Sequence, residues 1–201
     1  TGEESLPSAE ASCVNDLSID GGINRVSWAA VTGASKYVVY KFANGSFGYI
    51  GSTTELLIDD ENITADTADG PQIGRNPFSG TGNYPRAVTF IQQRLALAST
   101  DSEPQAVYLS QTANYENFGY ASPAKDSDAI TFRMRARQVN IVRSMLAARY
   151  GLLLLSSSAE WVVTGGSQSD AITPSAIVIA NQGYRGAAPV QPIAVGEMVL
   201  F

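Results

Sequence analysis

The chain has 201 residues, of which 44% are hydrophobic and 16% are charged, so it can bury a core and lacks the composition of a disordered segment. It contains no histidine and a single cysteine, Cys13, which excludes histidine-based triads, histidine metal sites, internal disulfides and cysteine-only zinc sites. The formal net charge of −6 disfavours general affinity for DNA or anionic membranes; residues 1–74 carry 11 acidic and 3 basic residues, and residues 75–201 carry 8 and 10.

Residues 9–62 are predicted to form a small β-sandwich. Turn signals at Asp20-Gly21-Gly22 and Asn44-Gly45 separate segments rich in β-branched and aromatic residues. The predicted strands cover residues 25–31, 36–42, 47–51 and 55–59. In the first strand Val26, Trp28 and Ala30 fall on one face, which predicts a core role for Trp28.

Residues 63–83 are predicted to be a linker. The stretch over residues 60–85 is polar, contains several glycines and prolines, and has no usable hydrophobic period. Because a loop of this length is unusual inside one compact domain, we expect a domain boundary here.

Strand patterns resume over residues 84–201. Residues 130–137 alternate between apolar and arginine side chains in a way that predicts one apolar and one charged strand face. Further strands are predicted over residues 88–90, 95–97, 107–110, 152–155, 161–163, 177–179 and 199–201. Residues 139–150 fit both a helical period and a strand, and their context favours the strand. The expected fold class is therefore all-β.

Three arginines, Arg133, Arg135 and Arg137, form the most distinctive charged feature of the sequence. Guanidinium groups in a row repel one another unless an anion faces them. Two interpretations stay open. The row contacts an acidic patch of a neighbouring subunit or a nucleic-acid backbone, with a protein partner favoured, or it is a solvent-facing edge that charge protects from stacking.

Acidic residues around position 60 are candidate calcium ligands. Asp59, Asp60, Glu61 and Asp66 supply oxygen ligands, but they lack the order of an EF-hand loop. A solvated loop, running from Asp59 to Asp69, is the favoured interpretation, and no metal site is predicted.

Catalytic motifs have little support, and no catalytic or cofactor-binding residue is predicted. Asp126, Asp128 and Glu160 are candidates for a glycosidase carboxylate pair, but nothing in the sequence fixes their separation. The glycine pairs at 80–82 and 165–166 do not sit in a nucleotide-binding frame. A serine nucleophile among residues 156–158 would need a lysine as its base, because the sequence has no histidine. Cys13 likewise has no histidine to activate it, so a buried or incidental thiol is favoured. The lysines are Lys36, Lys41 and Lys125.

Sugar stacking is the remaining candidate chemistry. Trp28, Tyr37, Tyr40 and Trp161 are the aromatic residues that suggest it. Packing in a core is favoured for Trp28 because its strand neighbours are apolar. The longest apolar run, at residues 151–155, is far shorter than the ~20 residues of a membrane span.

The first 62 residues resemble a fibronectin type III-like module. The similarity rests on Val26-Ser27-Trp28, on Gly33-Ala34-x-x-Tyr37-Val38-Val39-Tyr40 and on the glycine hairpin that follows. The resemblance implies that Trp28 packs in the sandwich core. Residues 1–8 resemble the end of an upstream module of the same type, and the missing final strands after Ile58 indicate a shortened repeat. The whole sequence is expected to be an excerpt of a longer chain.

Residues 75–201 resemble the tail proteins of tailed bacteriophages, in the nozzle or hub group that includes tail tubular protein B and the tail stabilisation protein. The ordered motifs are Asn76-Pro77-Phe78, Gly82-Asn83-Tyr84-Pro85, Gln92-Gln93-Arg94-Leu95, Ala98-Ser99-Thr100, Tyr115-Glu116-Asn117-Phe118, Asp126-x-Asp128-Ala129-Ile130, Glu160-Trp161 and Pro192-x-x-Val195-Gly196. The resemblance implies β-propeller-like blades over residues 84–201.

That resemblance also implies a function: a non-enzymatic structural component of a phage or prophage tail. It implies a homo-oligomer that contacts other tail proteins and lets DNA pass without specific binding. The expected location is the virion tail, after assembly in the host cytoplasm. The alternative is a secreted or surface module for adhesion or carbohydrate binding, and a propeller hydrolase is the third possibility.

Overall fold

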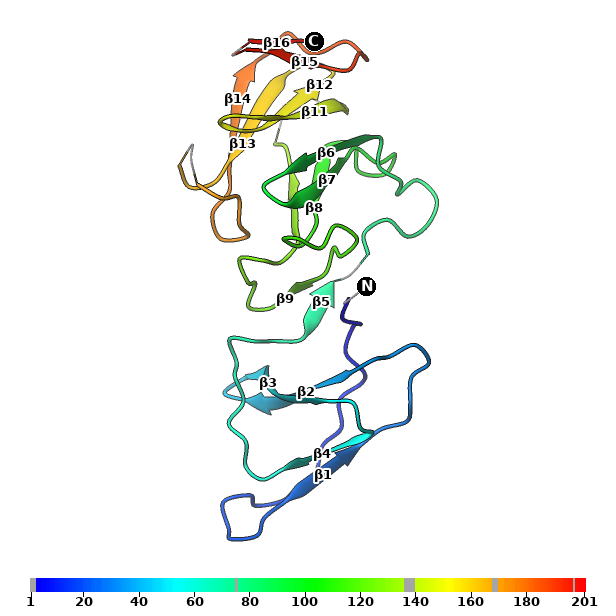
Figure 1. Cartoon of the computed structure of the whole chain (residues 1–201), viewed down its shortest axis with the longest axis vertical. Coiled ribbons are helices and arrows are strands. Elements are labelled where there is room, and N and C mark those ends of the chain that lie inside the picture. Colours follow the sequence, from blue (N-terminus) through cyan, green and yellow to red (C-terminus); the bar gives the residue numbers. More distant parts are fainter. Residues whose placement is uncertain (1–2, 75, 136–139, 168–169, 197) are drawn as a thin grey trace. The chain divides into compact units, whose positions relative to one another are not determined.

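The computed structural model describes residues 3–74, 76–135, 140–167, 170–196 and 198–201. These residues form strands β1 to β16 and no helix, so the predicted all-β class is confirmed (Figure 1). Within this part of the chain no helical segment has the length and hydropathy of a membrane span. The chain divides into two compact units, described separately below.

The N-terminal unit comprises Ser5–Ile73 and Ala121–Pro123. Strand β1 (Asn24–Ser27) pairs with β4 (Leu57–Asp60), and β2 (Tyr37–Ala43) forms a hairpin with β3 (Ser46–Thr53). Asn44 and Gly45 both have positive φ, at 52° and 88°, as the predicted two-residue turn requires. The hairpin predicted from Asn44-Gly45 is therefore confirmed.

The first predicted strand is wrong in its second half. Strand β1 ends at Ser27, and the Trp28 amide donates to the Leu56 carbonyl outside the ladder. Val26 and Ala30, expected on a buried face, are exposed. Trp28 is half-buried and packs on Tyr37, with ring centroids 5.4 Å apart. The apolar residues alternate as predicted, but among the described residues no second layer packs against the face that carries Val26 and Ala30.

The segment expected to be a linker contains ordered contacts. Asp66 exchanges two backbone hydrogen bonds with Tyr49, at 2.9 and 3.1 Å. A Cβ at Gly48 would lie 2.6 Å from the Asp66 backbone, so the absence of a side chain permits this close approach. Further along the segment, β5 (Gln72–Gly74) pairs with β9 (Tyr120–Ala121). These bonds are tertiary, and composition does not indicate them.

The C-terminal unit comprises Gly74–Tyr120 and Ala124–Phe201, with Glu3 and Glu4. Its first four-stranded sheet contains β6 (Ala87–Ile91), β7 (Arg94–Ala98), β8 (Ala106–Leu109) and β10 (Ile130–Arg133). The second contains β11 (Val142–Ala148), β12 (Gly151–Ser156), β13 (Glu160–Thr164) and β14 (Val178–Gly183). Each is an antiparallel meander, and the first strands of the two sheets, β6 and β11, lie side by side. A short hairpin of β15 (Ile193–Val195) and β16 (Met198–Leu200) follows.

Strand β11 falls within residues 139–150, the segment whose sequence fitted both a helix and a strand. The register shifts between Val142 and Ser144, so a β-bulge interrupts the strict alternation of faces. Val142 and Met145 are consequently both buried although they are three residues apart. The bulge therefore explains why the sequence mimics a helical period, and the preferred strand is confirmed.

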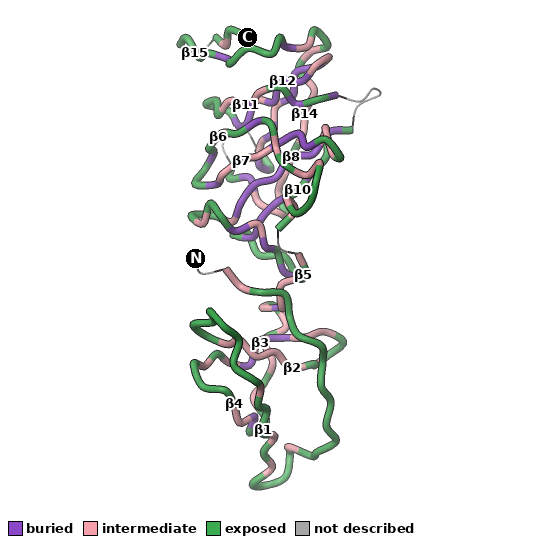
Figure 2. Tube along the Cα trace, turned by 90° about the vertical axis from the view of Figure 1, so that its right-hand side faces the viewer, coloured by how far each residue is buried: buried purple, intermediate pink, exposed green. Residues whose placement is uncertain are grey.

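The core of the C-terminal unit is one apolar cluster shared by both sheets (Figure 2). Its fully covered members include Ala96, Val107, Leu109, Leu152, Leu154 and Val163. The predicted alternation over β10 and the two residues after it is confirmed: Ile130, Phe132 and Met134 are buried, whereas Arg133 and Arg135 are exposed. Arg137 lies outside the described residues.

Candidate interaction surfaces

Arg94, at the start of β7, is a buried cation whose partners are backbone carbonyls. Its guanidinium donates to the carbonyl oxygens of Ser110, Asp126 and Asp128, at 2.7, 2.5 and 2.6 Å. Burial lowers the pKa of Arg94 from its ordinary value, and the carboxylates of Asp128 and Asp126 oppose that shift. The arginine thereby fixes the 126–128 loop against the ends of β7 and β8.

The turn between β6 and β7 is a second feature that sequence reasoning missed. Gln92 and Gln93 have φ values of 46° and 60°, in the left-handed region that non-glycine residues rarely adopt. The Gln92 side chain accepts a hydrogen bond from the Ile172 amide at 2.8 Å and donates to the Asp170 carbonyl at 3.4 Å. It therefore ties the first sheet to the loop that follows β13.

The three carboxylates considered for glycosidase chemistry are not brought together. Asp126 lines an open cavity of about 560 Å³ with Gln92, Thr112 and Thr173, and its carboxylate accepts from the Ser175 hydroxyl at 3.1 Å. Asp128 accepts from the Lys125 amide at 3.0 Å, and Glu160 lies in β13. Neither Asp128 nor Glu160 is among the described residues that line this cavity.

Glu160 is a buried acid whose Oε1 has no hydrogen-bond partner among the described residues. Its Oε2 lies 2.4 Å from the position that a Cβ on Gly183 would occupy, so a side chain at residue 183 would require the carboxylate to shift. Burying a charged group without partners costs free energy.

We expect Glu160→Gln to raise the free energy of unfolding by about 1 kcal/mol, because the amide keeps the shape and removes the charge. Urea unfolding at neutral pH measures the change. Glu116→Gln, which alters an exposed acid in the same unit, is the matched control and should leave the stability nearly unchanged. A loss of stability in Glu160→Gln would contradict the prediction.

The candidate calcium ligands bind different partners. Asp59 forms a paired contact with Arg25, at 2.7 and 2.8 Å. Asp60 lies 2.8 Å from the Lys41 ammonium and accepts from the Ile63 amide, and Asp66 accepts from the Ala68 amide. Within the described ranges no group of three or more acidic or cysteine side chains is arranged to hold a metal ion.

The remaining candidates occupy structural positions. Ser156 is buried and its hydroxyl donates to the Ala159 carbonyl at 2.5 Å, and the Ser158 hydroxyl bonds the Asn140 side chain. Cys13 is exposed, so of the two predicted alternatives the buried thiol is wrong and the incidental thiol remains. Gly80 and Gly82 have positive φ, in keeping with a turn. Lys36 is exposed.

The aromatic candidates for sugar stacking pack against protein. Trp161 is buried in the core of the C-terminal unit. Tyr40 packs edge-to-face on Tyr49 at 6.4 Å, and the Tyr37 hydroxyl accepts from the Val31 amide at 3.0 Å. These contacts supply the apolar partners that a core interpretation requires.

One arginine of the predicted row has an acidic partner. Arg133 donates from Nε and Nη2 to the two oxygens of Glu103, at 2.8 and 2.9 Å. This hydrogen bond and the charge of Arg133 hold the pKa of the Glu103 carboxyl below its usual value. Arg135 is exposed, and no described residue forms an ion pair with it.

The lowered pKa of Glu103 gives a pH dependence. Its contribution to stability is present above the pKa of the unfolded chain, and it is lost as the pH falls through the pKa of the folded chain. Chemical unfolding should therefore show a difference between wild type and Glu103→Gln at pH 7 that shrinks in acid. Because both side chains are largely exposed, that difference should be at most about 1 kcal/mol. A difference that grows in acid would contradict the assignment.

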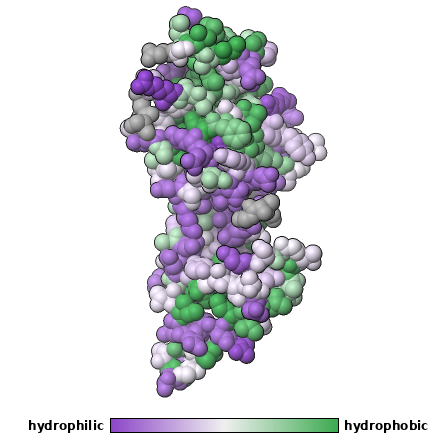
Figure 3. Space-filling view, in the orientation of Figure 1, coloured by the Kyte–Doolittle hydropathy of each residue, from purple (hydrophilic) through white to green (hydrophobic). Residues whose placement is uncertain are grey.

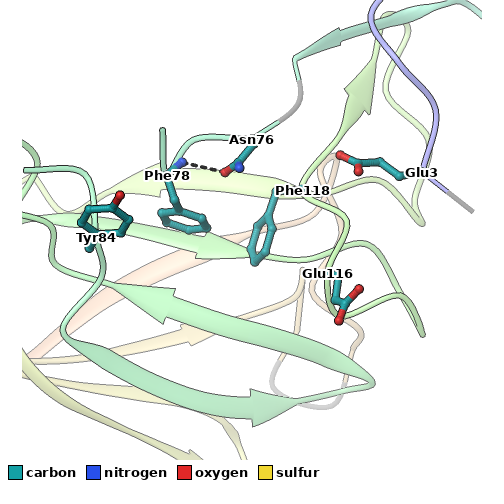
Figure 4. A pocket seen from close by; sticks show the side chains of 6 residues that line it. All are labelled: Glu3, Asn76, Phe78, Tyr84, Glu116 and Phe118. Atoms are coloured by element: carbon teal, nitrogen blue, oxygen red, sulfur yellow. Dashed lines mark hydrogen bonds between the residues drawn. The ribbon is translucent and has the colours of Figure 1, made fainter. Parts of the chain in front are cut away.

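A cavity of about 590 Å³ opens on the C-terminal unit (Figure 4). Glu3, Asn76, Phe78, Tyr84, Glu116 and Phe118 line it. Phe78 stands edge-to-face against Phe118 and Tyr108, with centroids 5.0 Å apart in both pairs. The Asn76 side chain accepts from the Phe78 amide at 2.8 Å, which fixes the turn that carries the ring.

Exposed apolar side chains gather on the hairpin β15–β16. Ile193, Met198 and Leu200 are 61%, 68% and 59% exposed, and Val195 and Phe201 are also exposed. The space-filling view shows this hydrophobic end of the C-terminal unit (Figure 3). A second exposed pair, Phe90 and Tyr115, packs edge-to-face at 5.3 Å. Contiguous exposed apolar surface of this kind marks sites of interaction.

Comparison with known proteins matches the larger part of the chain to one family. A family model described as bacteriophage nozzle protein covers residues 79–201, which contain both four-stranded sheets and the hairpin. No curated protein matches the chain. The chain belongs to the bacteriophage nozzle protein family.

Proposed function

We propose that this chain is a non-enzymatic structural component of a phage tail, which forms subunit contacts in the nozzle. The observation that carries the proposal is the exposed apolar hairpin β15–β16 in a chain of the nozzle family. A two-stranded hairpin is marginally stable in water by itself. A neighbouring subunit that covers Ile193, Met198 and Leu200 removes this surface from water and contributes to assembly.

Two features of the C-terminal unit support a propeller-like arrangement in the assembled nozzle. Four-stranded antiparallel meanders are the repeating element of β-propellers, in which they are set around a central axis. Here two such sheets follow one another in the chain, and their first strands, β6 and β11, lie side by side, as the inner strands of adjacent blades do. We propose that they are two blades and that the N-terminal unit is a fibronectin type III-like module of the same chain.

The net charge supports a passive role toward DNA. The chain has a formal charge of −6, and each phosphate neutralised by a basic group adds affinity. The acidic charge of the chain as a whole therefore supports passage of DNA without strong retention, and it comes from residues 1–74, since residues 75–201 carry 8 acidic and 10 basic residues. The proposed location is the virion tail, after assembly in the host cytoplasm with copies of this chain and other tail proteins.

Sedimentation of the full chain tests the proposed contacts. The double variant Ile193→Lys/Met198→Lys should dissociate the oligomer, because two charges would have to be buried in the interface. Val14→Lys/Val31→Lys alters two other exposed apolar residues, which lie in the N-terminal unit, and should leave the oligomer intact. A wild-type chain that is monomeric at every concentration, or equal behaviour of the two variants, would contradict the proposal.

A further inference from the structure

We propose that the cavity lined by Phe78, Tyr84, Phe118, Glu3 and Glu116 is a receptor for an arginine side chain, and that the arginine is Arg135 of a second copy of this chain. Nothing in the family assignment identifies this site or its occupant. The inference rests on the proposed self-assembly and adds a specific contact to it. We call this cavity the aromatic-acidic pocket.

The walls of the aromatic-acidic pocket are fixed before anything binds. Phe78 is held between Phe118 and Tyr108 in two edge-to-face contacts, with interplanar angles of 86° and 74°. Its backbone amide is bound by the Asn76 side chain. A ring held on both sides offers an apolar surface at little cost in conformational entropy.

The acidic side chains occupy one side of the pocket. Figure 4 places Glu3 and Glu116 beside Phe118, with Phe78 and Tyr84 on the other side. Glu116 is exposed, and no described residue forms an ion pair with it. The negative charge disfavours an anionic or nucleic-acid occupant and favours a cation.

The combination of rings and carboxylates selects arginine among the cations. A guanidinium stacks on aromatic faces and also forms two parallel hydrogen bonds with a carboxylate. Lysine has a compact, strongly hydrated ammonium that lacks the planar fork needed to lie flat on a ring and to pair with both carboxylate oxygens. A volume of about 590 Å³ accommodates such a side chain together with ordered water.

Arg135 and Arg185 are both exposed arginines of the C-terminal unit with which no described residue forms an ion pair, and we choose Arg135 because it continues the row that begins at Arg133. Arg135 is exposed two residues after β10 ends at Arg133, and no described residue forms an ion pair with it. Its neighbour Arg133 is already occupied by Glu103. A guanidinium and a carboxylate on the same unit, each without an ion-pair partner among the described residues, can make a head-to-tail contact between copies, and such contacts form a ring where the rotation between copies closes.

A charge-exchange cycle tests the contact by sedimentation of the full chain. Glu116→Arg and Arg135→Glu should each raise the dissociation constant of the oligomer at least about tenfold, because each places like charges face to face. The double variant Glu116→Arg/Arg135→Glu restores opposite charges and should recover most of the affinity. Circular dichroism confirms that each variant is folded.

The ligand chemistry is tested separately by heteronuclear NMR with N-acetyl-arginine amide as the probe, and N-acetyl-citrulline amide as its neutral isostere. The arginine probe should shift the amide signals of residues 76–84 and 116–118 in the Ile193→Lys/Met198→Lys variant, whereas citrulline should not. Glu116→Gln and Phe118→Leu should each abolish the shifts.

The outcomes separate the two proposals. If the hairpin variant dissociates but charge exchange restores nothing, Arg135 is not the occupant and the proposed assembly stands. If citrulline and arginine give equal shifts, the aromatic-acidic pocket does not recognise a cation and the inference is overturned. Arginine-specific shifts together with recovery in the double variant support both the receptor and its occupant.

Discussion

Arg94→Met should lower the free energy of unfolding of the C-terminal unit by about 3 kcal/mol or more, the largest single-residue effect that we expect outside the apolar core. Methionine fills similar space but donates no hydrogen bond. The carbonyls of the buried residues Ser110 and Asp128 would then be left without the donor that they share, and the carbonyl of the exposed Asp126 would lose its bond to the same side chain. Each unsatisfied buried carbonyl costs about 1–3 kcal/mol.

Urea unfolding followed by the fluorescence of Trp161 measures this effect. A Trp28→Phe background leaves Trp161 as the only tryptophan, and its burial in the C-terminal unit makes it a reporter of that unit. The measured quantity is the shift of the transition midpoint at a constant slope, because a changed slope would signal loss of two-state behaviour.

Two variants calibrate the result for Arg94. Arg94→Lys keeps the charge, but one ammonium does not reproduce the planar fork that reaches three carbonyls, so it should recover only part of the loss. Arg133→Met removes an exposed arginine with a surface partner and should cost at most about 1 kcal/mol. If Arg94→Met were no more damaging than Arg133→Met, the structural role assigned to Arg94 would be wrong.

The strands that the sequence predicts best are those with one apolar face against the shared core. Residues 130–134 alternate cleanly, and the structure buries Ile130, Phe132 and Met134 as predicted. Alternation fails as a guide where nothing covers the strand, as for Val26 and Ala30. It is also disguised where a bulge changes the register, as between Val142 and Ser144. The alternation of apolar residues shows which side chains could be buried. Whether they are buried depends on whether another part of the protein packs against that face of the strand.

The functional surfaces were less accessible to sequence reasoning. Arg94 stands in Gln-Gln-Arg-Leu, which resembles any exposed turn, and its partners are backbone atoms near positions 110 and 127. Backbone carbonyls leave no mark in a sequence, so only the tertiary arrangement shows the site. The aromatic-acidic pocket is similar, because Phe78, Tyr84 and Phe118 lie in irregular segments without periodicity. In the sequence alone, the available signals are a basic residue at the end of a predicted hairpin and aromatic residues inside polar loops.

Leu154→Ala should destabilise the C-terminal unit by about 2–5 kcal/mol. Leu154 is 0% exposed in β12, where it stands between Met145 of β11 and Trp161 of β13 in the register of the second sheet. Removal of its isobutyl group leaves a cavity between side chains that the three-strand ladder holds apart, so the site can collapse only partly.

The adjacent Leu153 provides a control with the same residue type, strand and backbone hydrogen bonding. It points to the opposite face of β12 and is only half-buried, so Leu153→Ala should cost distinctly less than Leu154→Ala. Urea unfolding in the Trp28→Phe background measures both. Equal losses of stability in the two variants would mean that both faces of the second sheet are covered equally. That result would contradict a single apolar core between the two sheets. A large loss of stability at Leu154 alone would show that one face of the second sheet supplies the apolar burial. This is the face that packs on the first sheet and holds the two sheets together.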